Sequence, residues 1–460
     1  MVGTMLNILY LPELREMLAE NNAQELGEFC VALHPARTAE FMEGLTADET
    51  WQVLSFTDGQ NRTQIFSYFS TEKQEEILNT QDRETVSQLV ADMAPDDRAD
   101  ILQDLETTLL EDLLSRIPAE ERRDYLRLSQ YPEATAGAVM TSEFAKLGGQ
   151  LTIQQAIAEI GRQSEEYETI YYLYVLDDED HLLGLVSARQ LLEGMRNPET
   201  KLAEIMETDL VTCAPLEDQE DVVDKVAKMD LLAIPVVEDE RKMLGIITHD
   251  DIIDVVQEEA TEDAHQMGAV NPLDETYLRT SVLTLSWKRG VWLMILFFFA
   301  LLTAFALEAY DNTLTKYVWL VSFIPLVISS GGNSGSQSAT LIITALSRGH
   351  ITLGDWLQVI IRELWMGLLL GTGLGLLGYV VALFFPGVDG MVVALVVPVT
   401  LLLVVVAGTL TGSILPLVFE RLGLDPAMMS NPFVAGIIDI VGIVIYMNVA
   451  MWFLSETTLH

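Results

Sequence analysis

The sequence predicts a multidomain membrane protein that joins an α-superhelical N-terminal domain, a tandem pair of α/β domains and an all-α transmembrane domain of five helices. The length is the first reason, because 460 residues are more than one compact core usually organises. The second is charge: residues 1–280 contain 20 Lys and Arg against 59 Asp and Glu, whereas residues 281–460 contain 6 against 9. The third is hydropathy, since several stretches of the second part approach the roughly 20 apolar residues of a bilayer-spanning helix.

Residues 1–135 are expected to form a stack of short helices. Apolar residues recur there at helical spacing, and the pattern is broken at Pro35, Pro95, Pro118 and Pro132. Each proline is followed by acidic or small polar residues, which suit the first turn of a helix. The opening residues show no basic segment and no small-residue cleavage site, so we expect an amphipathic helix rather than a signal peptide.

Residues 136–200 and 201–258 are expected to be two copies of one α/β domain. LYVLDDEDHLLGLVSARQLLE (173–193) aligns with IPVVEDERKMLGIITHDDIID (234–254) at a constant offset of 61 residues. Both copies read as strand, acidic turn, Leu-Gly, strand, Ser or Thr, and helix. A repeat of this size indicates a duplicated module.

A polar linker helix is expected over residues 259–284, ahead of the transmembrane domain at 285–460. The spans are expected near 289–307, 317–346, 357–385, 391–419 and 431–455. Lys288 and Arg289 precede the first span, and Arg348 follows the second. The positive-inside rule then places the N-terminus in the cytosol and, after five crossings, the C-terminus outside the plasma (inner) membrane.

The net charge of −42 narrows the partners. So acidic a surface repels phosphates instead of releasing their counterions, which excludes nucleic acid and favours cations. Cys30 and Cys213 lie far apart in the acidic part, which suits a reducing compartment and gives no disulfide or metal-site spacing. The sequence contains no ATP-hydrolysing motif, so we expect a protein that is not an enzyme.

One glycine motif is misleading. GLGLLG (373–378) matches the dinucleotide-binding pattern in its letters, but it lies inside an apolar span and not between a strand and a helix. Gly367, Gly371 and Gly375 recur every four residues, a spacing that lets membrane helices approach closely. We therefore expect these glycines to pack helices together.

A polar run interrupts the second span. PLVISSGGNSGSQSATLII (325–343) is rich in Gly, Ser, Asn and Gln and begins with a helix-perturbing proline. Polar backbone at membrane depth is tolerated only where it is buried in protein or lines a water-filled cavity. The run is therefore either a small-residue helix contact or a turn whose carbonyls line a pore, with Asn333 as the strongest side-chain oxygen donor.

The last span carries a carboxylate, Asp439. Placing a carboxylate near the bilayer centre costs about 2.5–3.5 kcal/mol, so such a residue faces the bundle interior and usually has a function there. A salt bridge is the alternative, but no Lys or Arg stands at comparable depth in the other spans. Oxygen ligands with a single charge favour a hard cation, and Mg²⁺ fits because it keeps several of its waters.

The sequence resembles the MgtE family of magnesium channels and transporters over nearly its whole length. In the membrane part, the resemblance rests on the polar run, extended to Leu346, and on LDPAMMSNPFVAGIIDIVGIVIY (424–446). The two repeats resemble CBS domains, and YPEATAGAVMT (131–141) looks like the lead-in to the first of them. The order of the segments also matches that family.

This resemblance implies a homodimer whose pore lies on the two-fold axis. It implies that Asp439 holds a hydrated Mg²⁺ ion and that Gly331, Gly332 and Asn333 lie beside it. It further implies that intracellular Mg²⁺, bound between acidic cytosolic domains, holds the linker as a plug helix in a closed state.

Acidic residues suited to such regulation crowd the helix that leads into the linker. They are Asp250, Asp251, Asp254, Glu258, Glu259, Glu262 and Asp263. Several are three or four positions apart, so like charges share a face and repel. Motif matching adds Glu220, Asp230, Asp96, Asp100 and Asp425. The alternative is a solvated acidic helix.

CBS pairs often bind adenine nucleotides through a Ser or Thr and an Asp that follow the second strand. The second copy has Thr248 and Asp251, whereas the first has Ser187 with Gln190 in place of the acid. ATP is therefore an open possibility at the CBS pair.

The sequence as a whole predicts a Mg²⁺-selective channel or transporter for magnesium uptake across the plasma membrane, gated by intracellular Mg²⁺. Two alternatives remain: a carrier for Co²⁺ or Ni²⁺ or an ion-coupled Mg²⁺ exporter, and a membrane-tethered sensor of Mg²⁺ or nucleotide.

Overall fold

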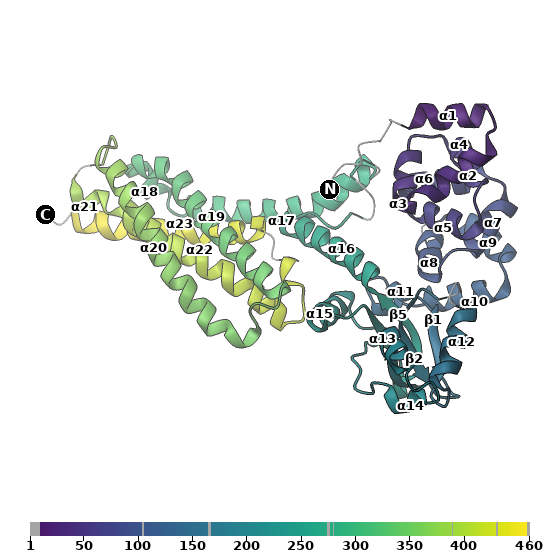
Figure 1. The fold of residues 1–460 in the computed structure, drawn as a ribbon. Helices are drawn as coiled ribbons and strands as arrows, with labels where there is room; N and C mark the ends of the chain where they lie inside the picture. The colour runs from purple at the N-terminus through teal and green to yellow at the C-terminus, as the bar shows by residue number, and fades with distance from the viewer. Residues whose placement is uncertain are drawn as a thin grey trace. The chain divides into compact units, whose positions relative to one another are not determined.

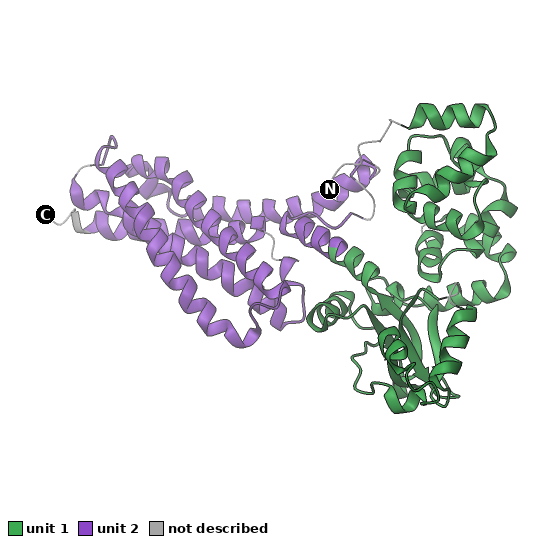
Figure 2. Cartoon of the chain, in the orientation of Figure 1, with its two compact units in different colours: residues 1–256 green, residues 257–460 purple. Residues whose placement is uncertain are grey.

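The computed structural model describes residues 10–103, 105–163, 167–273, 277–278, 280–388, 390–428 and 431–457. The chain divides into two compact units, residues 1–256 and residues 257–460 (Figures 1 and 2). The first unit contains the short helices and two small sheets, and the second contains the long apolar helices. This is the multidomain architecture that the sequence predicts.

The N-terminal part of the first unit is a stack of short helices, drawn in purple and blue in Figure 1. They are α1 (Leu11–Ala19), α2 (Ala23–Ala32), α3 (Pro35–Met42), α4 (Ala47–Leu54), α5 (Gly59–Ser67), α6 (Thr71–Thr80), α7 (Arg83–Ala91), α8 (Pro95–Gln103), α9 (Thr107–Arg116) and α10 (Ala119–Leu128). From α2 to α10 a new helix begins every 12 residues.

Side-chain caps set this spacing. Immediately before five of the helices, an Asn, Thr, Asp or Ser accepts a hydrogen bond from the N–H group three residues further on, and each such cap contributes about 1 kcal/mol. These residues are Asn22, Thr46, Asp58, Ser70 and Asp82. A ladder of fully buried side chains has the same spacing: Cys30, Met42, Leu54, Phe66, Leu78, Val90 and Leu102. The repeat therefore specifies both the helix starts and the core.

The tandem α/β pair follows. Its first part contains α11 (Ala136–Val139), β1 (Phe144–Gly148), α12 (Ile153–Gln163), β2 (Thr169–Leu176), β3 (Leu182–Ser187), α13 (Ala188–Gly194) and α14 (Leu202–Ile205). Its second part contains α15 (Gln219–Met229), β4 (Ala233–Val237), η1 (Asp239–Arg241), β5 (Met243–Thr248) and α16 (His249–Met267). β2 pairs with parallel β1 and antiparallel β3, and β4 pairs with antiparallel β5.

The two hairpins are superimposable in register. Tyr172 pairs with Ser187 in the first, and the residues 61 positions later, Ala233 and Thr248, pair in the second. The register also shifts at the same place in each hairpin. In the first the shift follows the residue that pairs with Gly184, and in the second it follows the residue that pairs with Gly245. The lead-in segments cross over: Thr141 pairs with Ile246 of the second copy, and Glu207 pairs with Leu185 of the first. The structure thus confirms the repeat and joins its copies into one body.

The second unit is built from long helices. They are α17 (Val282–Glu308), α18 (Asp311–Lys316), α19 (Trp319–Ser347), η2 (Leu353–Asp355), α20 (Trp356–Leu383), α21 (Met391–Ala394), α22 (Val396–Arg421), η3 (Pro426–Met428) and α23 (Asn431–Thr457). Within the described part of the chain, four segments are long and apolar enough to cross a membrane: Val282–Glu308, Leu353–Leu383, Met391–Arg421 and Asn431–Ser455. α19 has 29 residues, but its polar run lowers its mean hydropathy.

The polar run is helical, and the expected turn with free carbonyls is wrong. α19 continues without a break from Trp319 to Ser347, with Pro325 inside it, so the carbonyls of the run are engaged along the helix. Glycine and serine have low helix propensity, but close packing against α22 overrides that preference here. A Cβ atom at Gly408 would lie 2.5 Å from the Gly331 carbonyl oxygen, and one at Gly412 would lie 2.1 Å from that of Gly335.

α20 packs on α22 in the same way. A Cβ atom at Gly367, Gly371 or Gly375 would lie 2.9–3.0 Å from a backbone atom of α22. This confirms that the glycines of the third span are a packing stripe. α22 therefore lies at the centre of the unit, and α19 and α20 both approach it through glycine.

The α19–α22 contact gives a first prediction. Gly412→Ala must push the two helices apart, and we expect it to destabilise the protein by about 1–3 kcal/mol, the usual range for overpacking. A lower midpoint of thermal unfolding in detergent would show this. Gly373→Ala is the matched control, because a Cβ atom at Gly373 meets no atom within 4 Å. Equal midpoints for the two variants would contradict the predicted contact.

Candidate functional site

One side of α19 lies against the carboxylate of α23. A Cβ atom at Gly332 would lie 3.8 Å from Asp439 Oδ1 and 3.4 Å from the Ala435 Cβ atom. Asp439 itself is half-buried. Two of the residues expected in the pore, Gly332 and Asp439, are therefore neighbours, and the absence of a side chain at Gly332 leaves room beside the carboxylate.

Gly331 lies on a different side of the same helix. A Cβ atom there would lie 2.5 Å from Val404 Cγ1 and 2.7 Å from Ile438 Cγ2. The structure thus places Gly331 in the packing contact with α22 and α23. The polar run was expected to be either a small-residue helix contact or a pore-lining turn, and on this face it is a small-residue helix contact.

A third face of α19 is polar and exposed. Four residues share it, spaced seven, four and four positions apart: Ser322, Ser329, Asn333 and Gln337. The Asn333 amide donates a hydrogen bond to Ser329 Oγ at 3.2 Å, along the same face. In a helix that crosses a membrane, polar groups must contact water or other protein, so a face of this kind would need a cover other than lipid.

Hydrogen bonds fix α19 to the start of α23. The hydroxyl of Ser336 donates to the Asn431 carbonyl oxygen, and that of Thr340 donates to Asn431 Oδ1, both at 3.1 Å. Asp439 lies two turns further along α23. The carboxylate and the polar helix are thus held in one arrangement by contacts at the start of α23.

The end of α16 packs beside this region. Met267 contacts a buried cluster that includes Ala339, Val434 and Ile438. One turn earlier, burial and the charges of Asp425 and then Glu262 raise the pKa of Asp263. Three of the predicted regulatory acids therefore meet where α16 reaches the membrane helices.

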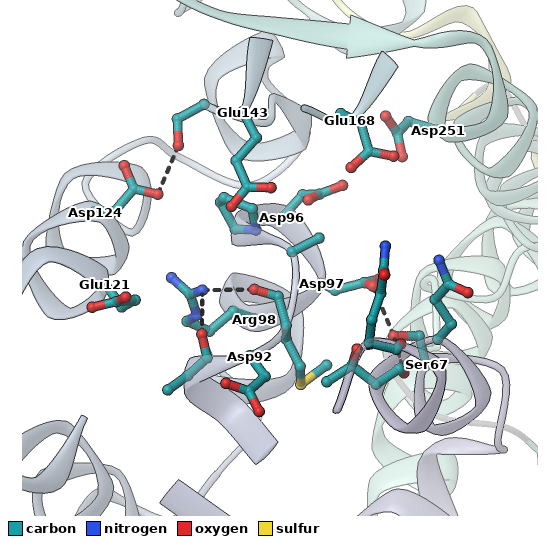
Figure 3. Close-up of a pocket in the computed structure, with 18 of the residues that line it drawn as sticks. Ser67, Asp92, Asp96, Asp97, Arg98, Glu121, Asp124, Glu143, Glu168 and Asp251 are labelled. Carbon is teal, nitrogen blue, oxygen red and sulfur yellow. Dashed lines mark hydrogen bonds between the residues drawn. The ribbon is translucent and has the colours of Figure 1, made fainter. Parts of the chain in front are cut away.

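The first unit contains a second acidic region, a cavity of about 1410 Å³. Predicted residues that line it are Asp96, Asp250, Asp251 and Asp254. Carboxylates that the sequence analysis missed are Asp92, Asp97, Glu120, Glu121, Asp124, Glu143 and Glu168. Figure 3 shows Asp96, Glu168 and Asp251 directed toward the same part of this cavity.

The cavity carries little free positive charge to balance these acids. Arg98 donates its hydrogen bonds to the carbonyls of Val90, Ala91 and Met93, where α7 ends. Arg127 is paired with Asp124 at 2.7 Å. Arg123, which also lines the cavity, donates a hydrogen bond to the Ala119 carbonyl oxygen at 3.1 Å. All three arginines are therefore already engaged, and the buried Asp96 Oδ1 has no hydrogen-bond partner among the described residues.

Crowding and burial shift the pKa values of these carboxyl groups upward. Burial raises the pKa of Glu168 to about 7, with the charges of Asp251 and Asp250 adding to the shift. Burial likewise raises the pKa of Asp251 to about 6. The pKa values of Asp96 and Asp97 are raised for the same reason, that of Asp96 strongly. These shifts mean that ionising the whole cluster is unfavourable unless a cation enters.

The cavity is not a preformed metal centre. Among the described residues, no three His, Cys, Asp or Glu side chains converge as they would around a bound metal ion. The carboxylates gather loosely around a large space. Such a site suits an ion that keeps its water shell, as Mg²⁺ does.

Other predicted residues lie elsewhere. Asp100 faces a small pocket on another side of α8, with Gln74 and Leu78. Glu220 is in the first turn of α15, a helix of 11 residues, and Asp230 is its C-cap, so the two acids lie at opposite ends of the helix. Among the remaining acids of α16, Glu258 is exposed and Glu259 is half-buried.

The residues expected at a nucleotide site have a structural task. The hydroxyl and backbone N–H of Thr248 donate to Asp251 Oδ2 at 2.6 and 3.1 Å, which caps α16. Ser187 and Gln190 form the corresponding capping box of α13. Nucleotide binding at these positions stays a prediction.

Comparisons with known proteins give the class of protein. A family described as a divalent cation transporter, MgtE, matches residues 324–449. The MgtE intracellular N domain matches residues 33–134, and the CBS domain matches residues 136–197 and 202–258. Together with the apolar helices and the carboxylates of the site, these matches define a divalent-cation transporter of the membrane with CBS domains.

Full-length relatives are more specific. The chain is 34% identical over 441 residues to the Magnesium transporter MgtE of Thermus thermophilus, covering 95% of this chain and 97% of that one. It is 30% identical over 440 residues to the Magnesium transporter MgtE of Bacillus subtilis, covering 96% of each. A crystal structure of the soluble part of a magnesium transporter matches 54% of this chain and 97% of its own, at 30% identity and a TM-score of 0.52. The chain belongs to the MgtE family.

The raised pKa values predict how stability depends on pH. The folded state holds a proton on Asp251 up to about pH 6, above the usual value of 3.8. This group therefore stabilises the fold at low pH, and the gain is lost as the pH rises through 6. Asp251→Asn keeps an oxygen that accepts the hydrogen bond from the Thr248 N–H but does not titrate. The unfolding free energy of this variant should therefore decrease less with rising pH than that of the wild type, by up to about 3 kcal/mol.

The measurement is chemical unfolding of the full chain in Mg²⁺-free buffer at several pH values, followed by far-ultraviolet circular dichroism. Glu16→Gln, which changes an exposed acid of α1, is the control. Parallel curves for both variants and the wild type would show that burial in the cavity does not raise the pKa of Asp251.

Proposed function

We propose that this chain is a Mg²⁺-selective channel or transporter that takes up magnesium across the plasma membrane and closes when intracellular Mg²⁺ is bound. The observation that carries this proposal is the half-buried carboxylate of Asp439 beside Gly332, next to the exposed polar face of α19. The names of the full-length relatives, all magnesium transporters, support the choice of ion.

The chemistry of these groups fits a hydrated divalent ion. Asp439 supplies a negative charge, and Asn333 and the neighbouring hydroxyls supply neutral oxygens. Mg²⁺ loses its waters reluctantly and is usually bound through one or two carboxylates with waters between. A membrane potential contributes about 2.3 kcal/mol per charge per 100 mV, so a divalent cation enters without coupling to another ion.

The exposed polar face also supports a homodimer. Ser322, Ser329, Asn333 and Gln337 would face lipid if one copy acted alone. A second copy placed with the same face inward would enclose a water-filled path between the two, and a two-fold axis is the commonest symmetry of homo-oligomers. In this arrangement each copy contributes one Asp439 to the path.

α19 is the fifth span in this proposal. Its 29 residues extend about 44 Å at 1.5 Å per residue, which exceeds the thickness of the hydrocarbon core. Lys288 and Arg289 in the first turns of α17, and Arg348 after α19, then lie on the cytosolic side. The N-terminus is cytosolic and the C-terminus extracytosolic.

Closure is assigned to α16. Met267 packs against a buried cluster that includes Ile438, the residue before Asp439. Asp263 and Asp425 repel one another near this contact, and a Mg²⁺ ion between them would remove the repulsion. In the first unit, a Mg²⁺ ion in the acidic cavity would likewise hold Asp251, at the start of α16, to Asp96 of α8.

Measurements of ion flux separate the alternatives. A carrier for Co²⁺ or Ni²⁺ would transport those ions in preference to Mg²⁺, and an ion-coupled exporter would need a proton or sodium gradient. A membrane-tethered sensor would bind Mg²⁺ in its cytosolic unit and give no flux. Uptake by liposomes that contain no second ion gradient therefore decides between channel, carrier and sensor.

We expect Asp439→Asn to reduce Mg²⁺ uptake into liposomes by at least about tenfold, which corresponds to about 1.4 kcal/mol in the barrier. The amide keeps the shape of the side chain but removes the charge that offsets the loss of solvation. Glu308→Gln, at the exposed end of α17, is the matched control and should transport like the wild type. Wild-type uptake by the Asp439 variant would contradict its place in the ion path.

We expect Asp263→Asn to weaken closure without removing transport. The variant loses a charge that attracts Mg²⁺ to the end of α16, so the internal Mg²⁺ concentration that half-closes the protein should rise about fivefold or more, about 1 kcal/mol. Uptake into liposomes loaded with graded internal Mg²⁺ measures this. Unchanged half-closure in Asp263→Asn, as in the surface control Glu16→Gln, would remove Asp263 from the regulatory site.

A further inference from the structure

A buried carboxylate of α20 has no place in the site described so far. Glu363 lies inside the apolar segment Leu353–Leu383 and is only 9% exposed. Its Oε2 accepts a hydrogen bond from the hydroxyl of Ser338 on α19 at 2.6 Å. Its backbone carbonyl accepts one from the hydroxyl of Thr409 on α22 at 3.2 Å. Glu363 thus joins three helices at one point.

Such a residue needs a reason to be there. Ionisable residues are rare within membrane segments and mostly functional, because lipid disfavours them. Among the described residues, no Lys, Arg or His lies within salt-bridge distance of Glu363. Its side-chain partner is Ser338, and a hydrogen bond to a carboxyl group is among the stronger kinds.

The contacts around Glu363 explain why a directional bond is needed. α19 approaches α22 through Gly331 and Gly335, which face Gly408 and Gly412. Glycine faces allow close approach but have no side chains that interlock, so they do little to prevent one helix from rotating against the other. A hydrogen bond at Ser338, one turn beyond Gly335, supplies the missing constraint.

The rotation of α19 about its own axis determines which of its residues face the proposed ion path. Successive residues of an α-helix are about 100° apart, so Ser338 lies about 240° around α19 from Gly332. Fixing Ser338 toward α20 therefore keeps Gly332 toward Asp439 and leaves Asn333 on the exposed polar face. A rotation by one residue would bring Ser334, now buried, to the position of Asn333.

We propose that Glu363 is a positioning residue, which holds Ser338 and so fixes the rotation of α19 that places Gly332 and Asn333 along the ion path. The role of this path rests on the proposed function, but the rotation of α19 does not. Glu363 acts through α19 and does not touch the ion.

The test combines transport with a readout of rotation. Cys30 and Cys213, both buried in the first unit, are first replaced by Ala in the full chain. Asn333→Cys or Ser334→Cys is then introduced, and its reaction with a water-soluble thiol reagent is followed in liposomes. The comparison is made with Glu363 intact and with Glu363→Leu, Glu363→Gln or Ser338→Ala. Thr372→Val is the control, because the Thr372 hydroxyl bonds the Leu368 carbonyl of its own helix.

With Glu363 intact, Asn333→Cys should react at least about tenfold faster than Ser334→Cys, since a buried thiol reacts only after local opening. Glu363→Leu and Ser338→Ala should bring the two rates together and reduce Mg²⁺ uptake by about tenfold, or about 1.4 kcal/mol. Glu363→Gln retains an acceptor oxygen and should restore both the labelling ratio and the uptake.

Several outcomes would overturn the proposal. These are an unchanged labelling ratio in both Glu363→Leu and Ser338→Ala, a changed ratio with wild-type uptake, or no restoration by Glu363→Gln. Because Ser338→Ala removes a single oxygen atom, it keeps the test decisive if Glu363→Leu fails to fold. Absence of uptake by the unmodified chain would contradict the proposed function, while the labelling ratio would still test the rotation.

Discussion

The membrane unit depends on one constraint: polar groups at membrane depth must find partners other than lipid. α19 meets this constraint differently on each of its faces. The glycine face is buried against α22, the face with Gly332 lies beside Asp439, and the face with Asn333 is exposed. A polar segment that is unfavourable in lipid becomes favourable when a close helix contact covers one side and water covers another. One helix therefore provides a packing face and, in our proposal, a separate face along the ion path.

The first unit is constrained by charge, because its cavity carboxylates have more negatively charged neighbours than positively charged ones. Arg98 uses its hydrogen bonds on the end of α7, so it does little to neutralise Asp96 or Asp251. Burial, and then the charges of neighbouring carboxylates, raise the pKa values of Asp96 and Asp251. A fold that holds like charges together in this way is stabilised by any cation that enters, and in our proposal this links its conformation to the Mg²⁺ concentration.

Single strong signals in the sequence predicted most of the fold and part of the candidate site. Asp439 stands out as a carboxylate in an apolar segment, and the 61-residue offset specifies the paired hairpins. The 12-residue helix repeat escaped notice because its caps alternate among chemically similar but different residues. Glu168 reaches the cavity only through the tertiary fold, which helical spacing cannot predict. Glu363 was missed since it follows Arg362 near the start of a span, where charged residues are ordinary.

In our proposal, the exposed polar face of α19 meets water inside the membrane. Spin labels at Gln337 and, as a lipid-facing reference, at the exposed Leu376 of α20 would test it in liposomes. Collision rates with a water-soluble nickel chelate and with oxygen, which prefers lipid, are then compared. We expect the label at Gln337 to collide mainly with the chelate and the label at Leu376 to collide mainly with oxygen. Preference for oxygen at both positions would contradict it.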